Sequence, residues 1–283
     1  MNHDQVRMGG FNILPAGVKN LLIINGLLFL ATYVFQKTGL VDLEHWLGLH
    51  YFSSQLFKPW QPITYMFMHA NFGHLFFNMF ALWMFGAAVE NAWGTKRFLL
   101  YYFITGMSAG MIHYLVIFFQ IHPTIALMDQ FLADPSLDSF RTLVTQYHGK
   151  YLNTEALQQT LAYLEQSPGI LNDVVYHVVS SKDAILNQFN LVGASGAVFA
   201  LLLAFGMLFP NAEIYIYFLF PIKAKWFVVI YGALELIYGV AGTGDGVAHF
   251  AHLSGMLVGL LLILLWRRYD KNQRSNNIYY HEF

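Results

Sequence analysis

The chain has 283 residues and a formal net charge of −1, and 57% of its residues are hydrophobic while only 11% are charged. A soluble domain carries about 25% charged residues, so this composition excludes an ordinary water-soluble protein and predicts a polytopic membrane protein. No basic cluster is large enough to hold a nucleic-acid backbone, and the absence of cysteine excludes disulfides, thiol nucleophiles and thiolate metal sites.

Six apolar runs predict membrane-spanning helices. In chain order they cover 18–35, a run that starts near His69 or His74 and ends near Val89, then 98–119, 191–209, 226–240 and 247–266. Their interiors carry almost no charge, with Glu235 and the terminal Glu90 as exceptions. Because backbone groups inside a membrane must be bonded internally, the predicted fold class is all-α, a bundle of six transmembrane helices. The first run has no cleavage site and is expected to be a retained signal anchor.

Basic residues and composition predict how the chain is organised across the membrane. If the six runs each cross the membrane, most lysines and arginines lie in segments on the same side of the membrane as the N-terminus. Because cytoplasmic segments carry an excess of basic residues, this predicts that both termini are cytoplasmic. The loop at 36–68 is apolar but broken by glycine and proline, and we expect it to lie at the membrane surface. The segment 120–190 is polar and contains patterns typical of amphipathic helices, such as 152–164. The expected parts are a cytoplasmic segment 1–17, spans 18–119, an extramembrane insert 120–190, spans 191–268 and a cytoplasmic tail 269–283.

Ser195 begins the fourth run within the small-residue stretch 193–196, which contains Gly193 and Gly196. Such residues let membrane helices pack closely, and a serine among them becomes a nucleophile when a base lies within hydrogen-bond reach. His252 lies at a similar predicted depth in the sixth run, and its imidazole can accept and return a proton near neutral pH. A buried structural histidine is the alternative, but ionisable residues in membrane spans are costly and favour a functional interpretation.

Two further patterns support this site. Gly255 and Gly259 follow His252 as G-x-x-x-G, which predicts close contact with the helix that carries Ser195. His74 and Asn78 are four residues apart, so they share a helix face and can both donate hydrogen bonds to a developing oxyanion. A metal site is the alternative for this second pair, but the pattern His-Glu-x-x-His is absent. We therefore expect no metal and no cofactor.

Together the motifs resemble those of the rhomboid intramembrane serine proteases. They are H-x-x-x-x-H-x-x-x-N at 69–78, G-x-S-G at 193–196 and A-H-x-x-G-x-x-x-G at 251–259, and the resemblance covers about 19–268 apart from the insert. It implies a six-helix rhomboid-like bundle with a membrane-associated first outer loop. It also implies a serine endopeptidase that cleaves transmembrane-anchored proteins near the outer face, with a Ser195–His252 dyad and no acidic third member, since Glu235 and Asp245 are not at the family's catalytic positions.

The resemblance assigns roles to the remaining residues. It implies that His74, Asn78 and the backbone N–H of Ser195 bind the oxyanion, that His69 is structural, and that Phe199 stacks on His252. His249 lies one turn before His252 and faces nearly the same side, so we expect it to brace the site or to donate a hydrogen bond to a residue of the site. Glu90 and Gly94 match the family and are expected to cap or brace a helix end. The chain departs from the family at Trp60-Gln61, where Trp-Arg is usual, at Phe199, where tyrosine is frequent, and in the length of its insert.

Two other functions stay open. The first is a catalytically inactive rhomboid-like protein that binds membrane clients, although Ser195 and both histidines are present. The second is a small transporter, which would need paired charges or broken helices in matching halves. The expected partners are transmembrane protein substrates and the lipid bilayer, not nucleic acid, and the small six-span core is typical of a bacterial plasma membrane protein.

Overall fold

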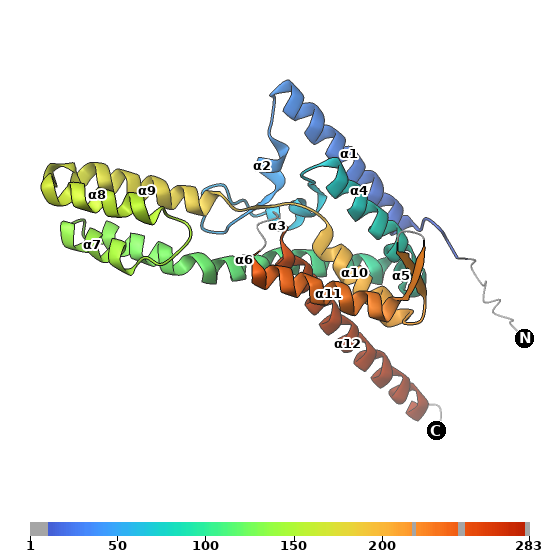
Figure 1. Cartoon of the computed structure of the whole chain (residues 1–283). Coiled ribbons are helices and arrows are strands. Elements are labelled where there is room, and N and C mark those ends of the chain that lie inside the picture. Colours follow the sequence, from blue (N-terminus) through green and yellow to red (C-terminus); the bar gives the residue numbers. More distant parts are fainter. Residues whose placement is uncertain (1–10, 217–218, 243–246, 281–283) are drawn as a thin grey trace, which may run out of the picture. The chain divides into compact units, whose positions relative to one another are not determined.

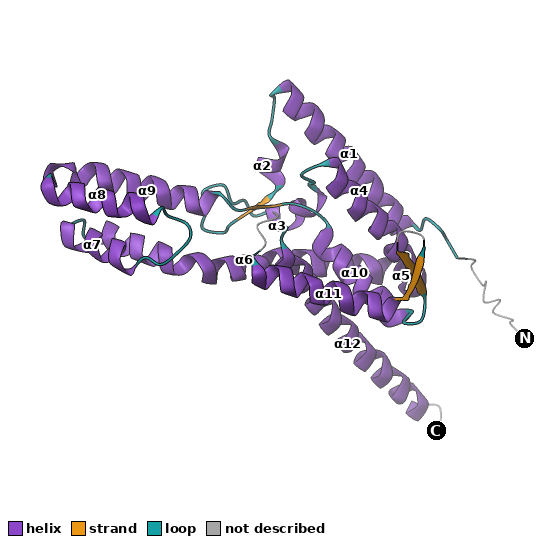
Figure 2. Ribbon diagram, viewed as in Figure 1, coloured by secondary structure: helices purple, strands orange, loops and turns teal. Residues whose placement is uncertain are grey.

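The computed structural model of the chain describes residues 11–216, 219–242 and 247–280, with side chains as far as Lys271. The predictions for residues 1–10, Asp245 and residues 281–283 lie outside the described residues. Nearly all of the described secondary structure is helical, as Figures 1 and 2 show, which confirms the all-α class.

The elements follow one another as short and long helices with four short strands. In chain order they are α1 (Ala16–Thr38), α2 (Leu43–Leu47), β1 (Leu49–His50), α3 (Gln61–Thr64), η1 (Tyr65–Phe67), α4 (Phe72–Ala81), η2 (Leu82–Gly86), α5 (Ala87–Trp93), α6 (Thr95–Ala133), α7 (Leu137–Gln146), α8 (Thr154–Gln166), η3 (Pro168–Ile170), α9 (Leu171–Asn187), β2 (Asn190–Leu191), α10 (Ser195–Leu208), β3 (Glu213–Ile216), β4 (Phe220–Lys223), α11 (Ala224–Ala241) and α12 (His249–Tyr280).

Five stretches of the described chain are helices long and apolar enough to cross a membrane. They are Ala16–Thr38, Phe72–Trp93, Thr95–Ala133, Ala224–Ala241 and His249–Lys271. The predicted fourth span, 191–209, is a shorter apolar helix, α10, of 14 residues. At 1.5 Å per residue it measures about 21 Å, less than the roughly 30 Å of a hydrocarbon core. The described part of the chain thus has five helices of spanning length and one shorter apolar helix, where the sequence predicts six spans.

The boundaries of α10 explain why it is shorter than its apolar run. Gly193 has φ 120°, a conformation that only glycine adopts readily, so the helix cannot extend back to residue 191. After Phe209 the chain turns at Pro210 into an antiparallel hairpin of β3 and β4, in which Glu213 pairs with Lys223. This hairpin was not expected from the apolar pattern.

The described residues fall into two compact units, and the first contains residues 11–49, 60–113 and 191–280. Its centre is α10, which packs against α12, α11 and the η2–α5 stretch (Figure 1). The residues of α10 that face these neighbours are small or aliphatic and have no exposed surface, including Ala197, Ala200, Leu201 and Ala204. A helix that is apolar on all sides is stable when other helices or lipid surround it. This central position is what brings the start of α10 close to several other elements.

Glu90 holds the start of α1 against the end of α5. Its Oε1 and Oε2 accept hydrogen bonds from the backbone N–H groups of Gly17 and Val18, each at 2.8 Å, and Thr95 Oγ1 donates to Oε1 at 2.7 Å. The first N–H groups of a helix have no partner within the helix, and a carboxylate there also interacts favourably with the helix dipole. The expected brace is therefore present, and the helix that it caps is α1.

Replacing Glu90 with glutamine is expected to destabilise the protein by about 1–3 kcal/mol, because the amide nitrogen cannot accept the hydrogen bond that the lost oxygen accepted. Thermal unfolding in detergent measures the change. Glu155 is exposed, and the Glu155→Gln control should shift the free energy of unfolding by less than about 0.5 kcal/mol. Equal midpoints for the two variants would contradict the capping role.

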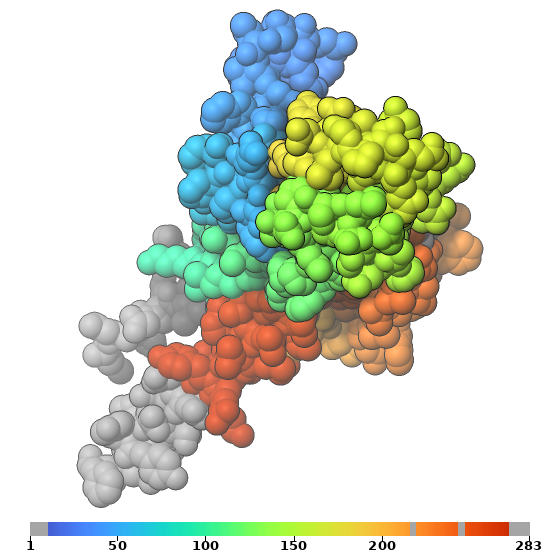
Figure 3. Space-filling model, turned by 90° about the vertical axis from the view of Figure 1, so that its left-hand side faces the viewer, coloured from blue at the N-terminus to red at the C-terminus, as the bar shows by residue number. Residues whose placement is uncertain are grey.

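The second unit contains residues 50–59 and 114–190. Its helices α7, α8, α9 and the end of α6 bury an apolar core, and Figure 3 shows one face of these helices in green and yellow. The core residues are Met128, Phe131, Phe140, Leu143, Leu164, Val174 and Val178. The predicted amphipathic helix at 152–164 is confirmed as α8.

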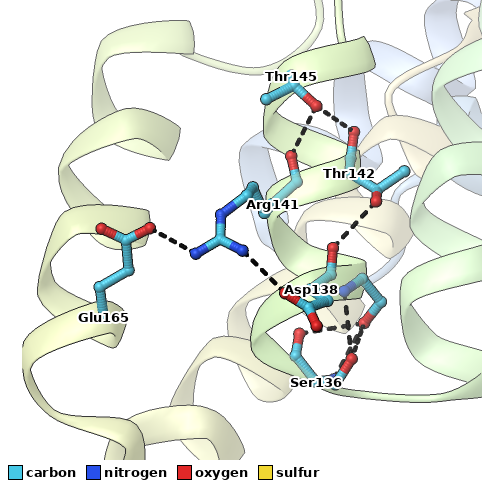
Figure 4. Close-up of polar contacts among 7 residues, drawn as sticks. Ser136, Asp138, Arg141, Thr142, Thr145 and Glu165 are labelled. Carbon is cyan, nitrogen blue, oxygen red and sulfur yellow. Dashed lines mark hydrogen bonds and ion pairs between the residues drawn. The ribbon is translucent and has the colours of Figure 1, made fainter.

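Polar contacts on the surface of the second unit join its helices. Arg141 forms ion pairs with Asp138 at 2.8 Å and with Glu165 at 2.9 Å, as Figure 4 shows. These side chains are largely exposed, so each pair adds at most about 1 kcal/mol. Ser136 begins α7 with a capping box, in which its side chain and that of Ser139 accept from each other's backbone N–H groups.

Candidate active site

Ser195 and His252 meet where two helices of the first unit begin. Ser195 is the first residue of α10, and His252 lies in the first turn of α12. The distance between Ser195 Oγ and His252 Nε2 is 2.8 Å, and the imidazole is 8% exposed. A hydroxyl and an imidazole at this distance can exchange a proton.

Glycines make this approach possible. A Cβ added to Gly255 on α12 would overlap the backbone oxygen of Gly196 on α10. A Cβ on Gly259 would meet the Tyr101 hydroxyl and lie 3.2 Å from the Cβ of Ala200. The structure thus places the G-x-x-x-G face of α12 against α10, and the absence of side chains there lets the two backbones touch.

Aromatic packing fixes the plane of the His252 ring. The ring of Phe199 stacks on it, with ring centroids 4.2 Å apart and an interplanar angle of 6°. Phe199 lies one turn after Ser195 on the same helix, so both residues of α10 contact the imidazole. The stacked ring restricts rotation of His252 about its side-chain bonds.

His74 lies against the turn that precedes Ser195. A Cβ on Gly193 would lie 2.7 Å from both Cε1 and Nε2 of His74, so only glycine fits at this position. The backbone N–H of Gly193 donates a hydrogen bond to the backbone oxygen of Tyr65 at 2.9 Å, which connects this turn to η1. Because Ser195 is the first residue of α10, its own N–H has no partner within the helix and can bind an oxyanion.

Asn78 and His69 contact other groups. Asn78 is buried, and its Nδ2 donates to the backbone oxygen of His74 at 2.9 Å, which uses one of its two amide hydrogens. His69 is also buried, and its ring lies edge-on to that of His74 with centroids 5.1 Å apart. His74 is therefore placed directly against the Ser195 turn, whereas Asn78 adjoins it through the His74 backbone and His69 through the His74 ring.

Glu235 is the residue that sequence reasoning missed. The resemblance implies a dyad with no acidic third member, whereas the structure places the Glu235 carboxylate beside His252. The Oε2 atom of Glu235 on α11 lies 2.9 Å from His252 Nδ1 and 2.7 Å from His249 Nδ1. The signal that could have found it is the charge itself, since a carboxylate inside an apolar span marks a functional site more often than not.

The same three residues could hold a metal ion. The possible ligand atoms of Glu235, His249 and His252 all lie within 4.8 Å of one another, and the side chains are buried. Around a tetrahedral zinc with bonds near 2.0–2.1 Å, neighbouring ligand atoms are roughly 3.3 Å apart. The two oxygen–nitrogen distances, 2.7 and 2.9 Å, are instead those of hydrogen bonds, so the arrangement fits protons better than a metal.

Comparison with known proteins identifies the family. A sequence model described as "Rhomboid domain" matches residues 56–121 and 142–269. Rhomboid-like protein 11, chloroplastic, of Arabidopsis thaliana is 33% identical over 102 residues, which are 36% of this chain and 34% of that protein. Rhomboid protease GluP of Bacillus subtilis is 40% identical over 52 residues, 18% of this chain and 10% of that protein.

A third relative aligns over a similar length. Rhomboid protease GlpG of Yersinia pestis is 29% identical over 84 residues, 29% of this chain and 30% of that protein. The chain thus spans about a third or less of the length of these relatives. The family model, however, covers more than half of the chain, and the five apolar helices of spanning length agree with an integral membrane protein. This chain belongs to the rhomboid family, which contains intramembrane proteases and rhomboid-like proteins.

Proposed function

We propose that this protein is an intramembrane serine endopeptidase in which Ser195 is the nucleophile and His252 the general base and acid. The observation that carries the proposal is the distance of 2.8 Å between Ser195 Oγ and His252 Nε2, within a bundle of apolar helices. A serine hydroxyl is a weak nucleophile by itself and becomes an effective one when a base accepts its proton. The relatives named as rhomboid proteases support the same activity.

The proposed reaction has two steps. In the first, Ser195 Oγ attacks the peptide carbonyl carbon while His252 Nε2 takes the hydroxyl proton, and this proton then goes to the leaving amine as the C–N bond breaks. In the second, His252 accepts a proton from water as the water oxygen attacks the acyl carbon. The bond between that carbon and Ser195 Oγ then breaks, and His252 returns the proton to Oγ. No metal and no cofactor takes part.

The proposed oxyanion site consists of the Ser195 backbone N–H, the His74 imidazole and the Asn78 amide. The imidazole lies against the Gly193 turn, and the N–H belongs to the positive end of the α10 dipole. Asn78 has one amide hydrogen beyond the one that it gives to the His74 oxygen. Donors fixed in place before the charge develops stabilise the tetrahedral intermediate.

Replacing Asn78 with alanine is expected to lower kcat about 10- to 100-fold, at or below the roughly 10²- to 10³-fold loss typical of removing one oxyanion donor, since two other donors remain. Asn25 offers a matched control, because it is buried and its Nδ2 also donates to a backbone oxygen four residues earlier, that of Leu21. Asn25→Ala should lower thermal stability without changing kcat. An unchanged kcat in Asn78→Ala would assign Asn78 a structural role.

The proposed substrates are transmembrane-anchored proteins, cleaved near the outer face of a bacterial plasma membrane if both termini of this chain are cytoplasmic. A peptide bond within a helix has its carbonyl engaged by hydrogen bonding, so the substrate must unwind locally before Ser195 can attack. Residues with low helix propensity reduce the free energy of unwinding. We therefore expect cleavage next to small or helix-breaking residues of the substrate span.

The test is cleavage of a purified transmembrane test substrate by the full chain in detergent and in liposomes. The proposal expects cleavage by the wild type and none by Ser195→Ala. Equal cleavage by both proteins would show that the activity does not come from this site. Binding of the substrate by the wild type without cleavage in either medium would instead support an inactive, client-binding protein.

A further inference from the structure

We propose that Glu235 is a positioning residue that makes the catalytic pair a Ser195–His252–Glu235 triad. This inference rests on the proposed function and adds to it the group that sets the protonation state of His252. Glu235 lies on α11 and is 7% exposed. Its Oε2 contacts one ring nitrogen of His252 while Ser195 contacts the other.

The two contacts of His252 require a particular tautomer. Nε2 can accept the proton of Ser195 only if it carries no hydrogen, and the neutral ring must then carry its hydrogen on Nδ1. An ionised carboxylate accepts hydrogen bonds and donates none, so Glu235 at 2.9 Å from Nδ1 favours the tautomer with hydrogen at that atom. The serine, the ring and the carboxylate are thus arranged so that the proton can pass from Ser195 to Nε2.

The Glu235 carboxylate also stabilises the positive charge that forms on His252 during the reaction. When His252 takes the serine proton it becomes an imidazolium ion among apolar helices, where an isolated charge is strongly disfavoured. A carboxylate already in contact with Nδ1 stabilises that ion without having to move. The proton stays on His252 in this step, and Glu235 remains ionised.

His249 holds Glu235 in place from the other side. Its Nδ1 lies 2.7 Å from the same Oε2 atom, and its ring is nearly perpendicular to that of His252, at 88° with centroids 6.4 Å apart. An Nδ1–H from each histidine satisfies the carboxylate in its buried position. His249 and His252 are three residues apart at the start of α12, so one turn of helix supplies both donors.

A purely structural role is the alternative, because the same contacts join α11 to α12. A brace would affect the free energy of unfolding but not the protonation state of His252 or the rate of the chemical step. The experiment must therefore measure quantities that a brace does not change.

The test is Glu235→Gln, which keeps the size of the side chain and removes its charge. Glutamine can turn its NH₂ group toward Nδ1 and thereby favour the wrong tautomer. We expect kcat to fall about 10- to 100-fold with KM unchanged within about twofold, less than the roughly 10⁴-fold loss known when the corresponding carboxylate of a Ser-His-Asp triad becomes an amide. In a His252→Ala background the same change should produce no further loss.

Glu90→Gln is the matched control, because it also removes a buried, hydrogen-bonded carboxylate in the first unit. It should lower the thermal midpoint and leave kcat unchanged when both proteins are assayed below their unfolding temperatures. If Glu235→Gln behaves like Glu90→Gln, with lower stability and wild-type kcat, Glu235 is a brace and the inference is wrong. Failure of the proposed function is a separate result, recognised by cleavage in Ser195→Ala.

Two measurements on the wild-type protein apply even if Glu235→Gln does not fold. With ¹⁵N-labelled histidine, the NMR signals absent from His252→Ala should show hydrogen on Nδ1 at the pH of activity, and hydrogen on Nε2 would overturn the inference. Treatment with a chelator should leave cleavage unchanged. Loss of cleavage restored by Zn²⁺ would show that Glu235, His249 and His252 hold a metal instead.

Discussion

Replacing Ser195 or His252 with alanine is expected to lower kcat by about 10⁴- to 10⁶-fold, the largest effect of any substitution in this chain. Ser195 supplies the atom that bonds to the substrate carbonyl, and His252 is the group in contact with its proton. Without the base the hydroxyl stays protonated and weakly nucleophilic. Without the hydroxyl, only water activated by the remaining groups can attack.

The double variant should be no slower than the slower single variant, because the two residues act as a unit. Cleavage rates of the four proteins give this comparison, and labelling by a serine-reactive fluorophosphonate reports the nucleophile directly. Ser254 is a control on the same helix, since it is buried and its Oγ donates to the Phe250 backbone oxygen. Ser254→Ala should keep labelling and cleavage within a few-fold of wild type, whereas additive losses in the double variant would separate the roles of Ser195 and His252.

The contact between Ser195 and His252 is of a kind that sequence can anticipate. Its residues stand next to small residues at the ends of apolar runs, and small residues on two membrane helices indicate that their backbones approach closely. Gly196, Gly255 and Gly259 are such residues, and in the structure they lie at the contact of α10 with α12. The resemblance implies the stacking of Phe199 on His252, and helical spacing agrees with it, because residue 199 lies one turn after residue 195 on the same face of α10.

Glu235 could not be placed by the same reasoning. The residues around it on α11 are apolar on every side of the helix, so the pattern does not indicate which face of α11 meets α12. Its partners are 14 and 17 residues away along the chain, on the next helix, and the sequence does not define how α11 and α12 are oriented. The charge of Glu235 within an apolar run indicates a functional residue, but it does not indicate which side chain the carboxylate contacts.

The ends of helices were predicted least well, for a related reason. Apolar character continues through 191–194, but the conformation of Gly193 starts α10 at Ser195. At α6 the opposite occurs, because the helix continues to Ala133 well beyond the predicted apolar run that ends at residue 119. Apolar runs report where lipid or core surrounds the chain, whereas helix ends depend on caps and turns.

Replacing Gly255 with valine is expected to lower kcat at least about 10²-fold and to destabilise the protein by about 3 kcal/mol or more. Even the first carbon of the new side chain would overlap the backbone oxygen of Gly196, so α12 must move away from α10. The atoms of Gly196 that the new side chain meets belong to the backbone of α10, which cannot rotate away as a flexible side chain can. His252 lies on α12 and Ser195 begins α10, so this displacement lengthens the distance between their reacting atoms, and a misplacement of about 1 Å is enough for a loss of this size.

Gly26→Val on α1 is the matched control, because a Cβ at Gly26 meets no atom within 4 Å. It introduces the same β-branched residue into a helix, so its effect on helix propensity cancels in the comparison. Thermal unfolding and cleavage rates of both variants measure the difference. If Gly255→Val stays as active and as stable as Gly26→Val, then close contact between α10 and α12 is not what holds His252 beside Ser195. If its activity falls while its stability does not, the contact serves the alignment of the two residues more than the stability of the bundle.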